Sequence, residues 1–301
     1  MHDNSTTERA VDFLLGLIEA EAAERARQRM GPRPLPSKQR TGLRSFLGRK
    51  SEEAERPEDS LDARRKSYSW WTQTPVPSSV LLWVLEEDDP ELNAIVWRHM
   101  NADDSMRRAI ARGIPYGAGR TTAVPLTHPL RRDQEPPVPE HFTKYGLIGA
   151  LRASTSMAPA RNAGSMVLGA ADWQTVTEAD REHPLPGYAR WVLAVRPDCP
   201  PALRAQFGSH AKFTHRVRQA GVIDGAAQYA LSWNPAGRVL RVLSLGRTMF
   251  PSRVGEAEDA LRPLVREHLG DREEAWAVLA QLIGTYHGTV PELVITAGAI
   301  A

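Results

Sequence analysis

The stretch "WVLEEDDPELNAIVWRHMNADDSMRRAIARG", residues 83–113, has the same layout as "WVLAVRPDCPPALRAQFGSHAKFTHRVRQAG", residues 191–221. Each begins Trp-Val-Leu, and each ends at a glycine equally far from that tryptophan. Such repetition is typical of chains built from small helical units, which bury their apolar faces only by stacking into a continuous core. The alternative is a chance similarity between two groups of helices, because proline and aspartate caps recur in any helical protein.

The first copy contains the start and stop signals of three helices. Pro77 precedes "SSVLLWVL", which is apolar nearly all round and therefore predicts a buried helix. Asp89 and Pro90 are typical of the cap and first turn of the next helix, and Asp103 or Asp104 caps the third. The glycine at position 113 ends it.

The second copy predicts the same arrangement. "GYARWVLAV" follows a proline, Asp198 stands where a cap is needed, and Gly208 ends the helix after it. If the copies are equivalent, Ile95 and Leu203 are both buried, and Asp89 and Asp198 both cap helices.

A third stretch shows a weaker similarity to the second copy. "ALRASTSMAPARNAG", residues 150–164, matches "AVRPDCPPALRAQFG", residues 194–208, at its alanine, arginine and glycine positions. The separation of about 44 residues falls within the period of HEAT and armadillo units. No sustained alternation typical of strands is present. The sequence therefore predicts an all-α fold, an irregular HEAT-like helical-repeat stack with a flexible N-terminal arm.

Three stretches resemble a known group of proteins: "DDPELNAIVWRHMNADDSMRRAIARG", "HPLPGYARWVLAVRPDCPPALRAQF" and "LGDREEAWAVLAQLIGTYHGTVPELV". They resemble helical-repeat proteins of filamentous actinobacteria, which are HEAT-like or similar to the variant leucine-rich repeat. The resemblance covers roughly residues 75–301 apart from the proline-rich insert. It implies a helical-repeat fold and no particular activity, so it assigns no catalytic residue.

Composition shifts divide the chain. Residues 1–31 predict one amphipathic helix whose apolar stripe includes Val11, Leu14, Leu15 and Ile18. Residues 32–76 are charged and poor in large apolar side chains, which is typical of a flexible linker. Residues 77–301 form the predicted helical-repeat domain. Within it, residues 113–140 are a proline-rich insert that allows no long helix.

Composition sets broad limits on location and partners. The chain has 301 residues, 42% hydrophobic and 25% charged, with a net charge of +2, which gives no overall bias toward nucleic acid. Cys199 is the only cysteine, which excludes an intrachain disulfide and favours a reducing compartment. No signal peptide or apolar run of membrane-spanning length is present. We expect a cytoplasmic protein.

The motifs of common catalytic sites are absent from the sequence. "GAGRTT", residues 117–122, lacks the spacing and lysine of a phosphate-binding loop, and a plain turn explains it better. Cys199 could be activated at a helix start, but a small buried cysteine is the commoner case. His210 and His215 do not share a helix face and have no cysteine pair beside them. We therefore expect no catalytic residue, no metal and no cofactor, although an active site without a short motif stays open.

The remaining features point to partner binding. Residues 25–50 carry nine basic side chains and no acid, which suits nucleic acid or an anionic membrane surface, unless the acids that follow neutralise them. The stripe on the first helix could mediate self-association or recruit a protein partner. The favoured function is a non-enzymatic scaffold for protein–protein interaction, and the alternative is HEAT-like nucleic-acid binding through residues 25–50 and arginines of the repeat. One basic face shared by these arginines would favour the alternative: Arg107, Arg108, Arg112, Arg216 and Arg218. The candidate partner-binding residues are Val11, Leu14, Leu15, Ile18, Arg33, Lys38, Arg40, Arg44, Trp70 and Trp71.

Overall fold

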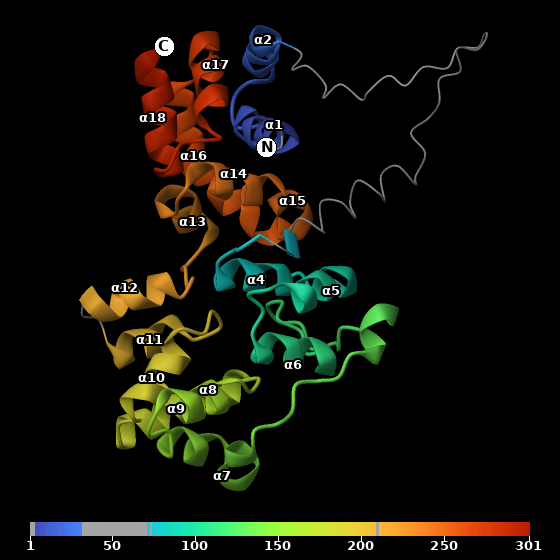
Figure 1. Cartoon of the computed structure of the whole chain (residues 1–301), viewed down its shortest axis with the longest axis vertical. Coiled ribbons are helices and arrows are strands. Elements are labelled where there is room, and N and C mark those ends of the chain that lie inside the picture. Colours follow the sequence, from blue (N-terminus) through green and yellow to red (C-terminus); the bar gives the residue numbers. More distant parts are fainter. Residues whose placement is uncertain (1–3, 32–70, 73, 209–210) are drawn as a thin grey trace, which may run out of the picture. The chain divides into compact units, whose positions relative to one another are not determined.

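The computed structural model describes residues 4–31, 71–72, 74–208 and 211–301, and every regular element among them is a helix (Figure 1). The all-α prediction is confirmed for these residues. The chain divides into two compact units. Unit 1 comprises residues 1–70, 229–245 and 257–301, and unit 2 comprises residues 71–228 and 246–256.

Unit 1 joins the first helices of the chain to the last ones. Its helices are α1 (Asn4–Leu15), α2 (Ala20–Met30), α14 (Ala236–Ser244), α17 (Glu273–Leu282) and α18 (Val290–Ile300). It also contains most of α13 (Ala226–Ser232) and of α16 (Pro251–His268), both of which cross the unit boundary. Within this unit α1 packs on α14, and α2 packs on α17. Figure 1 shows the N-terminal helices in blue beside the red C-terminal ones.

The N-terminal segment is two helices where the sequence predicts one. The break covers residues 16–19, beginning at Gly16, a residue that weakens helices. Breaking the helix there lets Leu17 become fully buried, while Ala23 and Ala26 face the core from α2. Because both helices pack inside unit 1, the expectation that residues 1–31 form a flexible arm separate from the helical domain is not met.

Unit 2 is a succession of short helices. They are α4 (Ser78–Leu85), α5 (Pro90–Arg98), α6 (Asp104–Arg112), α7 (Glu140–Arg152), α8 (Met157–Gly164), α9 (Ala170–Glu182), α10 (Gly187–Ala194), α11 (Pro201–Phe207), α12 (Ala211–Gln219) and α15 (Gly246–Met249). Between α6 and α7, the proline-rich insert contains only the short 3-10 helix η1 (His128–Arg132). Its prolines keep this stretch irregular, as the sequence predicts, because proline has a fixed φ and no backbone N–H.

The two copies of the layout have matching helices. Each has an eight-residue first helix (α4 and α10) and a nine-residue third helix (α6 and α12). Gly113 and Gly221, which end them, both have left-handed backbone angles, φ +66° and +78°. Ile95 and Leu203 are 8% and 2% exposed, as equivalence requires.

The predicted aspartate caps are present in the first copy, but the one predicted at Asp198 in the second copy is not. The Asp89 carboxylate accepts hydrogen bonds from the backbone N–H groups of Glu91 (2.7 Å) and Leu92 (3.1 Å), which confirms it as a cap. Asp103 likewise accepts from the N–H of Met106, 2.9 Å away. The prediction for Asp198 is wrong, because its carboxylate pairs with Arg196 through two bonds of 2.6 and 2.9 Å. The residues two and three positions after Asp198 are Pro200 and Pro201, which have no backbone N–H to donate, so the carboxylate bonds the Arg196 guanidinium instead.

Buried arginines hold the helix ends of unit 2 together. Arg196, 3% exposed, donates to the carbonyl oxygens of Gly164 and Met166 at the end of α8, the latter at 2.7 Å. Arg108 is also buried and donates to the carbonyl of Pro136 (2.7 Å) and to the carboxylate of Glu135 (3.0 Å), which fastens the insert to α6. The last carbonyls of a helix lack internal partners, and a guanidinium with five donors can satisfy several of them.

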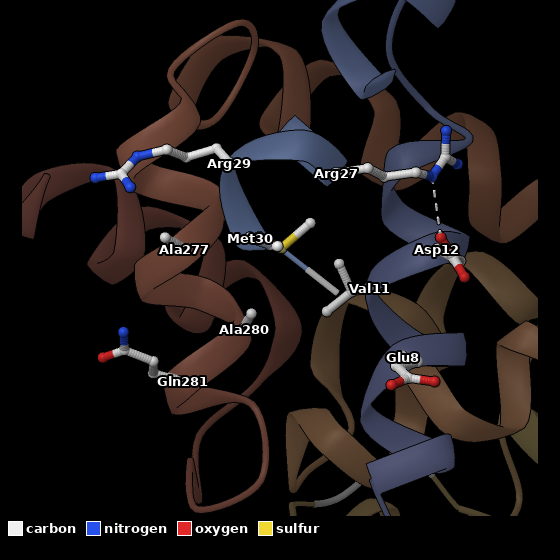
Figure 2. A pocket seen from close by; sticks show the side chains of 10 residues that line it. Glu8, Val11, Asp12, Arg27, Arg29, Met30, Ala277, Ala280 and Gln281 are labelled. Atoms are coloured by element: carbon white, nitrogen blue, oxygen red, sulfur yellow. Dashed lines mark hydrogen bonds and ion pairs between the residues drawn. The ribbon is translucent and has the colours of Figure 1, made fainter. Parts of the chain in front are cut away.

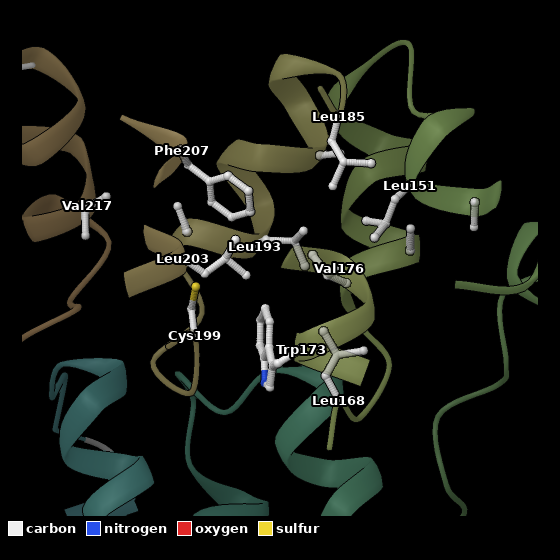
Figure 3. Packing of buried hydrophobic residues seen from close by; sticks show 14 of the residues in the cluster. Leu151, Leu168, Trp173, Val176, Leu185, Leu193, Cys199, Leu203, Phe207 and Val217 are labelled. Carbon is white, nitrogen blue, oxygen red and sulfur yellow. The ribbon is translucent and has the colours of Figure 1, made fainter. Parts of the chain in front are cut away.

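An apolar cluster of unit 2 lies among α7–α12 (Figure 3). Leu203 contacts it from α11 together with Phe207, while Leu193 joins from α10 and Trp173 from α9. The guanidinium of Arg196 lies 5.4 Å from the centre of the Trp173 ring and covers it. The cluster thus ties the second copy of the layout to the helices before it.

Trp71 anchors the start of unit 2. Its side chain is fully buried and meets the ring of His99 edge-on, with 5.2 Å between the ring centres. The Nδ1 atom of His99 accepts the backbone N–H of Asn101 at 3.0 Å, and Nε2 lies 3.0 Å from the carbonyl of Thr74. A ring that accepts at Nδ1 and donates at Nε2 is neutral, because a protonated imidazole has no lone pair for the N–H of Asn101.

This geometry predicts a loss of stability in mild acid. Burial lowers the pKa of His99 below its usual 6.5, and the positive charge of Arg107 acts in the same direction. The unfolded chain therefore takes up a proton near pH 6.5 while the folded chain does not, so the free energy of unfolding falls as pH drops from about 6.5 toward 5. Urea denaturation at several pH values measures this fall, and His99→Gln should flatten it. An equal slope in the variant would assign the effect to other groups.

Candidate functional site

The apolar stripe of the first helix is part of the core of unit 1. Val11, Leu14 and Leu15 are 4%, 0% and 1% exposed, and Ile18 is half-buried. Their helix packs on α14, whose Val239 and Leu240 are fully buried. The expectation that this stripe is exposed for a partner is therefore wrong, because the stripe already covers another apolar face of the same chain.

Most of the other candidate residues lie outside the described residues. These are Arg33, Lys38, Arg40, Arg44 and Trp70. Trp71 is described and buried, so it contributes packing and offers no exposed ring. Binding of nucleic acid or of an anionic membrane through residues 25–50 stays a prediction.

The residues considered for chemistry have structural roles. Cys199 is buried, as the sequence favours, and burial raises the pKa of its thiol to about 12, which opposes thiolate formation. The loop amides of Tyr116 and Gly117 donate to the Asp88 carboxylate at 2.7 and 2.9 Å, so an internal anion occupies this turn. Among the described residues, no group of histidine, cysteine and acidic side chains has the arrangement of a metal site.

The three α6 arginines among those suggested for nucleic-acid binding do not form an exposed basic face. Arg108 is buried, and Arg112 pairs with Glu135 at 2.7 Å. Arg107 donates to the carbonyl oxygens of Trp97 (3.3 Å) and His99 (3.4 Å) at the end of α5. Because these three side chains are engaged within the chain, the first copy of the layout offers little free positive charge to phosphates.

An aromatic groove in unit 2 is a candidate binding site. We use this name for a cavity of about 460 Å³ lined by Met157, Gly187, Tyr188, Arg190, Trp191, Phe207, Phe213 and Arg216. Its residues come from the start of α8, from α10, from the end of α11 and from α12. Cavities of this size and lining are typical of binding sites for a small molecule or a few side chains of a partner.

Helix periodicity positions the aromatic rings. Tyr188 and Trp191 are three residues apart on α10 and therefore share a face. The Trp191 ring meets Phe213 of α12 edge-on, with 6.0 Å between ring centres. Tyr188 is 47% exposed, so nearly half of this aromatic side chain is in contact with water.

The two arginines of the groove differ in charge compensation. Arg190 forms a bidentate pair with Asp180, at 2.8 and 3.1 Å. Burial alone would raise the pKa of Asp180, but its hydrogen bonds from Arg190, Leu185 and Gln206 hold that pKa below the usual value. Arg216 is exposed and pairs with no carboxylate among the described residues. Among the described residues that line the groove, Arg216 therefore contributes a positive charge that no carboxylate compensates.

Sequence reasoning missed the groove. It used Trp191 only as the start of the repeated layout and weighed Arg216 only as part of a basic face. The aromatic spacing in "GYARW", residues 187–191, is a signal that could have been read. No comparable signal links it to Phe207 and Phe213, because those rings come from two other helices, α11 and α12.

Comparisons with known proteins give no relative. Protein-family models, curated proteins and solved structures were searched, and none matches the chain. In the part of the chain that the structure describes, none of the helices has the length and apolar character needed to cross a bilayer.

Proposed function

We propose that this chain is a non-enzymatic, HEAT-like helical-repeat protein that acts as a scaffold, with the aromatic groove receiving a segment of a partner protein. The occupant carries an apolar side chain for the rings and a carboxylate for Arg216. The observation that carries this proposal is the combination of exposed aromatic surface with a single unpaired arginine. The matching helices of the two layouts support the repeat architecture.

The charge at the rim selects the chemistry of the occupant. Aromatic rings alone would suit a cationic ligand, because their faces attract positive charge. Arg216 opposes a cation at this position and attracts an anion. Arg190 does not add to this attraction, because Asp180 neutralises it.

The small number of unpaired basic side chains in the groove favours a protein partner over nucleic acid. Sequence-independent binding to nucleic acid commonly uses about 6–10 phosphate contacts. Among the described residues of the groove, Arg216 is the arginine without a carboxylate partner, and this matches a single carboxylate of a peptide. Aromatic side chains in such grooves usually provide most of the affinity for a protein segment.

Selection from a library of random phage-displayed peptides on the full chain tests the proposal. We expect enriched peptides to share a large apolar residue near an aspartate or glutamate. Gly187→Leu should weaken a selected peptide by more than about tenfold, because Gly187 lines the groove and a side chain added there has open space that the peptide would otherwise use. Arg216→Ala should weaken it about fivefold, since it removes one exposed ionic contact.

Two matched substitutions serve as controls. Gly255→Leu adds the same side chain to an exposed helical position outside the groove, again with nothing within 4 Å. Arg98→Ala removes an exposed arginine from α5. Neither should change peptide binding. The proposal fails if the groove variants bind selected peptides as well as the controls do, or if they lose affinity only for a labelled oligonucleotide.

A further inference from the structure

The end of the proline-rich insert is an extended segment on the surface of unit 2. We call residues 133–140, "DQEPPVPE", the proline segment. Asp133 has φ −79° and ψ 140°, and Pro139 has φ −61° and ψ 136°, both close to the polyproline II conformation. The residues between them include two further prolines, whose φ is fixed, and residues that precede a proline, which are restricted to the same region. The proline segment is therefore a preformed extended ligand.

Hydrogen bonds and ion pairs hold one side of the proline segment against α6. Arg108 donates to the carbonyl oxygens of Pro136 at 2.7 Å and Pro137 at 3.4 Å. The Glu135 carboxylate pairs with Arg108 at 3.0 Å and with Arg112 at 2.7 Å. Because these contacts fix the backbone, a partner that binds the segment has little conformational freedom left to remove.

The other side of the proline segment faces solvent. Val138 is 44% exposed, and Pro137 and Glu140 are also exposed. Two residues separate Val138 from Glu140, which corresponds to about 6 Å along a polyproline II strand. Glu140 forms no ion pair among the described residues, whereas Glu135 is already paired. The exposed side thus combines apolar groups with an available carboxylate, the two features that the aromatic groove selects.

We propose that the occupant of the aromatic groove is the proline segment of a second copy of this chain. The inference rests on the function proposed for the groove and names the partner. Proline-rich segments bind in grooves lined with aromatic rings, because their preformed conformation makes ordering inexpensive. Val138 and Pro137 would lie against the ring of Trp191, and the Glu140 carboxylate would meet Arg216.

The occupant comes from a second copy because the two surfaces do not meet within one chain. None of residues 133–140 lines the groove of its own chain, and the carbonyl oxygens of the segment are held by Arg108. The segment and the groove are different surfaces, so each copy offers one ligand and one receptor. Such a contact between unlike surfaces builds a ring or an open chain of copies, not a two-fold dimer.

Sedimentation equilibrium of the full chain, from about 10 µM to about 1 mM, tests the inference. The mass should rise with concentration. Glu140→Arg and Arg216→Glu should each weaken this self-association about tenfold or more, because each brings like charges together. An equal mixture of the two variants should associate again. The reversed segment of the first variant matches the reversed groove of the second, and the unchanged segment of the second matches the unchanged groove of the first.

Two charge reversals serve as matched controls. Glu91→Arg changes an exposed glutamate in the first turn of α5, as Glu140→Arg does in the first turn of α7. Arg29→Glu changes an exposed arginine in the last turn of α2, as Arg216→Glu does in α12. This arginine lines another cavity, of about 520 Å³, in unit 1 (Figure 2). Neither control should alter the mass, and all four variants should keep the helix signal in circular dichroism.

The outcomes separate this inference from the function proposed for the groove. If the full chain stays monomeric while selected peptides still bind the groove, the groove binds a partner protein and the second copy is not that partner. The inference is also overturned if Glu140→Arg associates as well as Glu91→Arg does, or if mixing the two reversed variants restores nothing. If selected peptides do not bind the groove either, both proposals are wrong.

Discussion

Replacing Arg196 with alanine is expected to lower the free energy of unfolding by about 3–5 kcal/mol. The substitution leaves Asp198 without its bidentate partner and two carbonyl oxygens at the end of α8 without a donor. It also uncovers the ring of Trp173. Removing one partner of a buried pair is costly, because the remaining charge stays buried and uncompensated. Urea denaturation followed by far-UV circular dichroism measures the change.

A substitution of Asp198 tells whether its carboxylate acts as a helix cap or as the ion-pair partner of Arg196. A helix cap replaced by alanine costs about 0.5–2 kcal/mol. Asp198→Ala should cost more than this, because it leaves the Arg196 guanidinium buried without its carboxylate. Arg131→Ala, which removes an exposed arginine from η1, should stay within about 0.5 kcal/mol of the wild type. A cost below about 1 kcal/mol for Arg196→Ala would show that this cluster contributes little.

Leu203→Ala is expected to cost about 2–5 kcal/mol. Leu203 is almost fully buried in the cluster that α7–α12 share, so the truncation removes apolar contacts and leaves a cavity. The cost of such a cavity depends on how far its neighbours collapse, and here they come from several different helices. The same urea experiment measures it.

An exposed leucine provides the matched control. Leu231 is 37% exposed on α13, so Leu231→Ala should cost about 1 kcal/mol or less. If Leu203→Ala were as mild as this control, position 203 would not be a core position, and the equivalence of Ile95 and Leu203 would lose its energetic basis.

Local sequence signals predicted the helices well where the cause is local. Asp89 and Asp103 cap helices as predicted, since a cap depends only on backbone amides two or three residues away. The prolines of residues 113–140 keep that stretch irregular for an equally local reason, their fixed φ. Asp198 resembles Asp89, but the prediction failed for an equally local reason: Pro200 and Pro201, two and three residues later, have no backbone N–H, and the carboxylate pairs with Arg196.

The sequence by itself determined the all-α class, the short helices of the two layouts and the ends of most of them, because these depend on side chains within one or two helical turns. Only the tertiary structure decided what the apolar stripes cover. The spacing of Val11 and Leu14 requires an apolar partner but does not say whether it is α14 or another molecule. The same holds for the aromatic groove. Its lining combines residues from four helices, α8, α10, α11 and α12, and only packing brings those residues together.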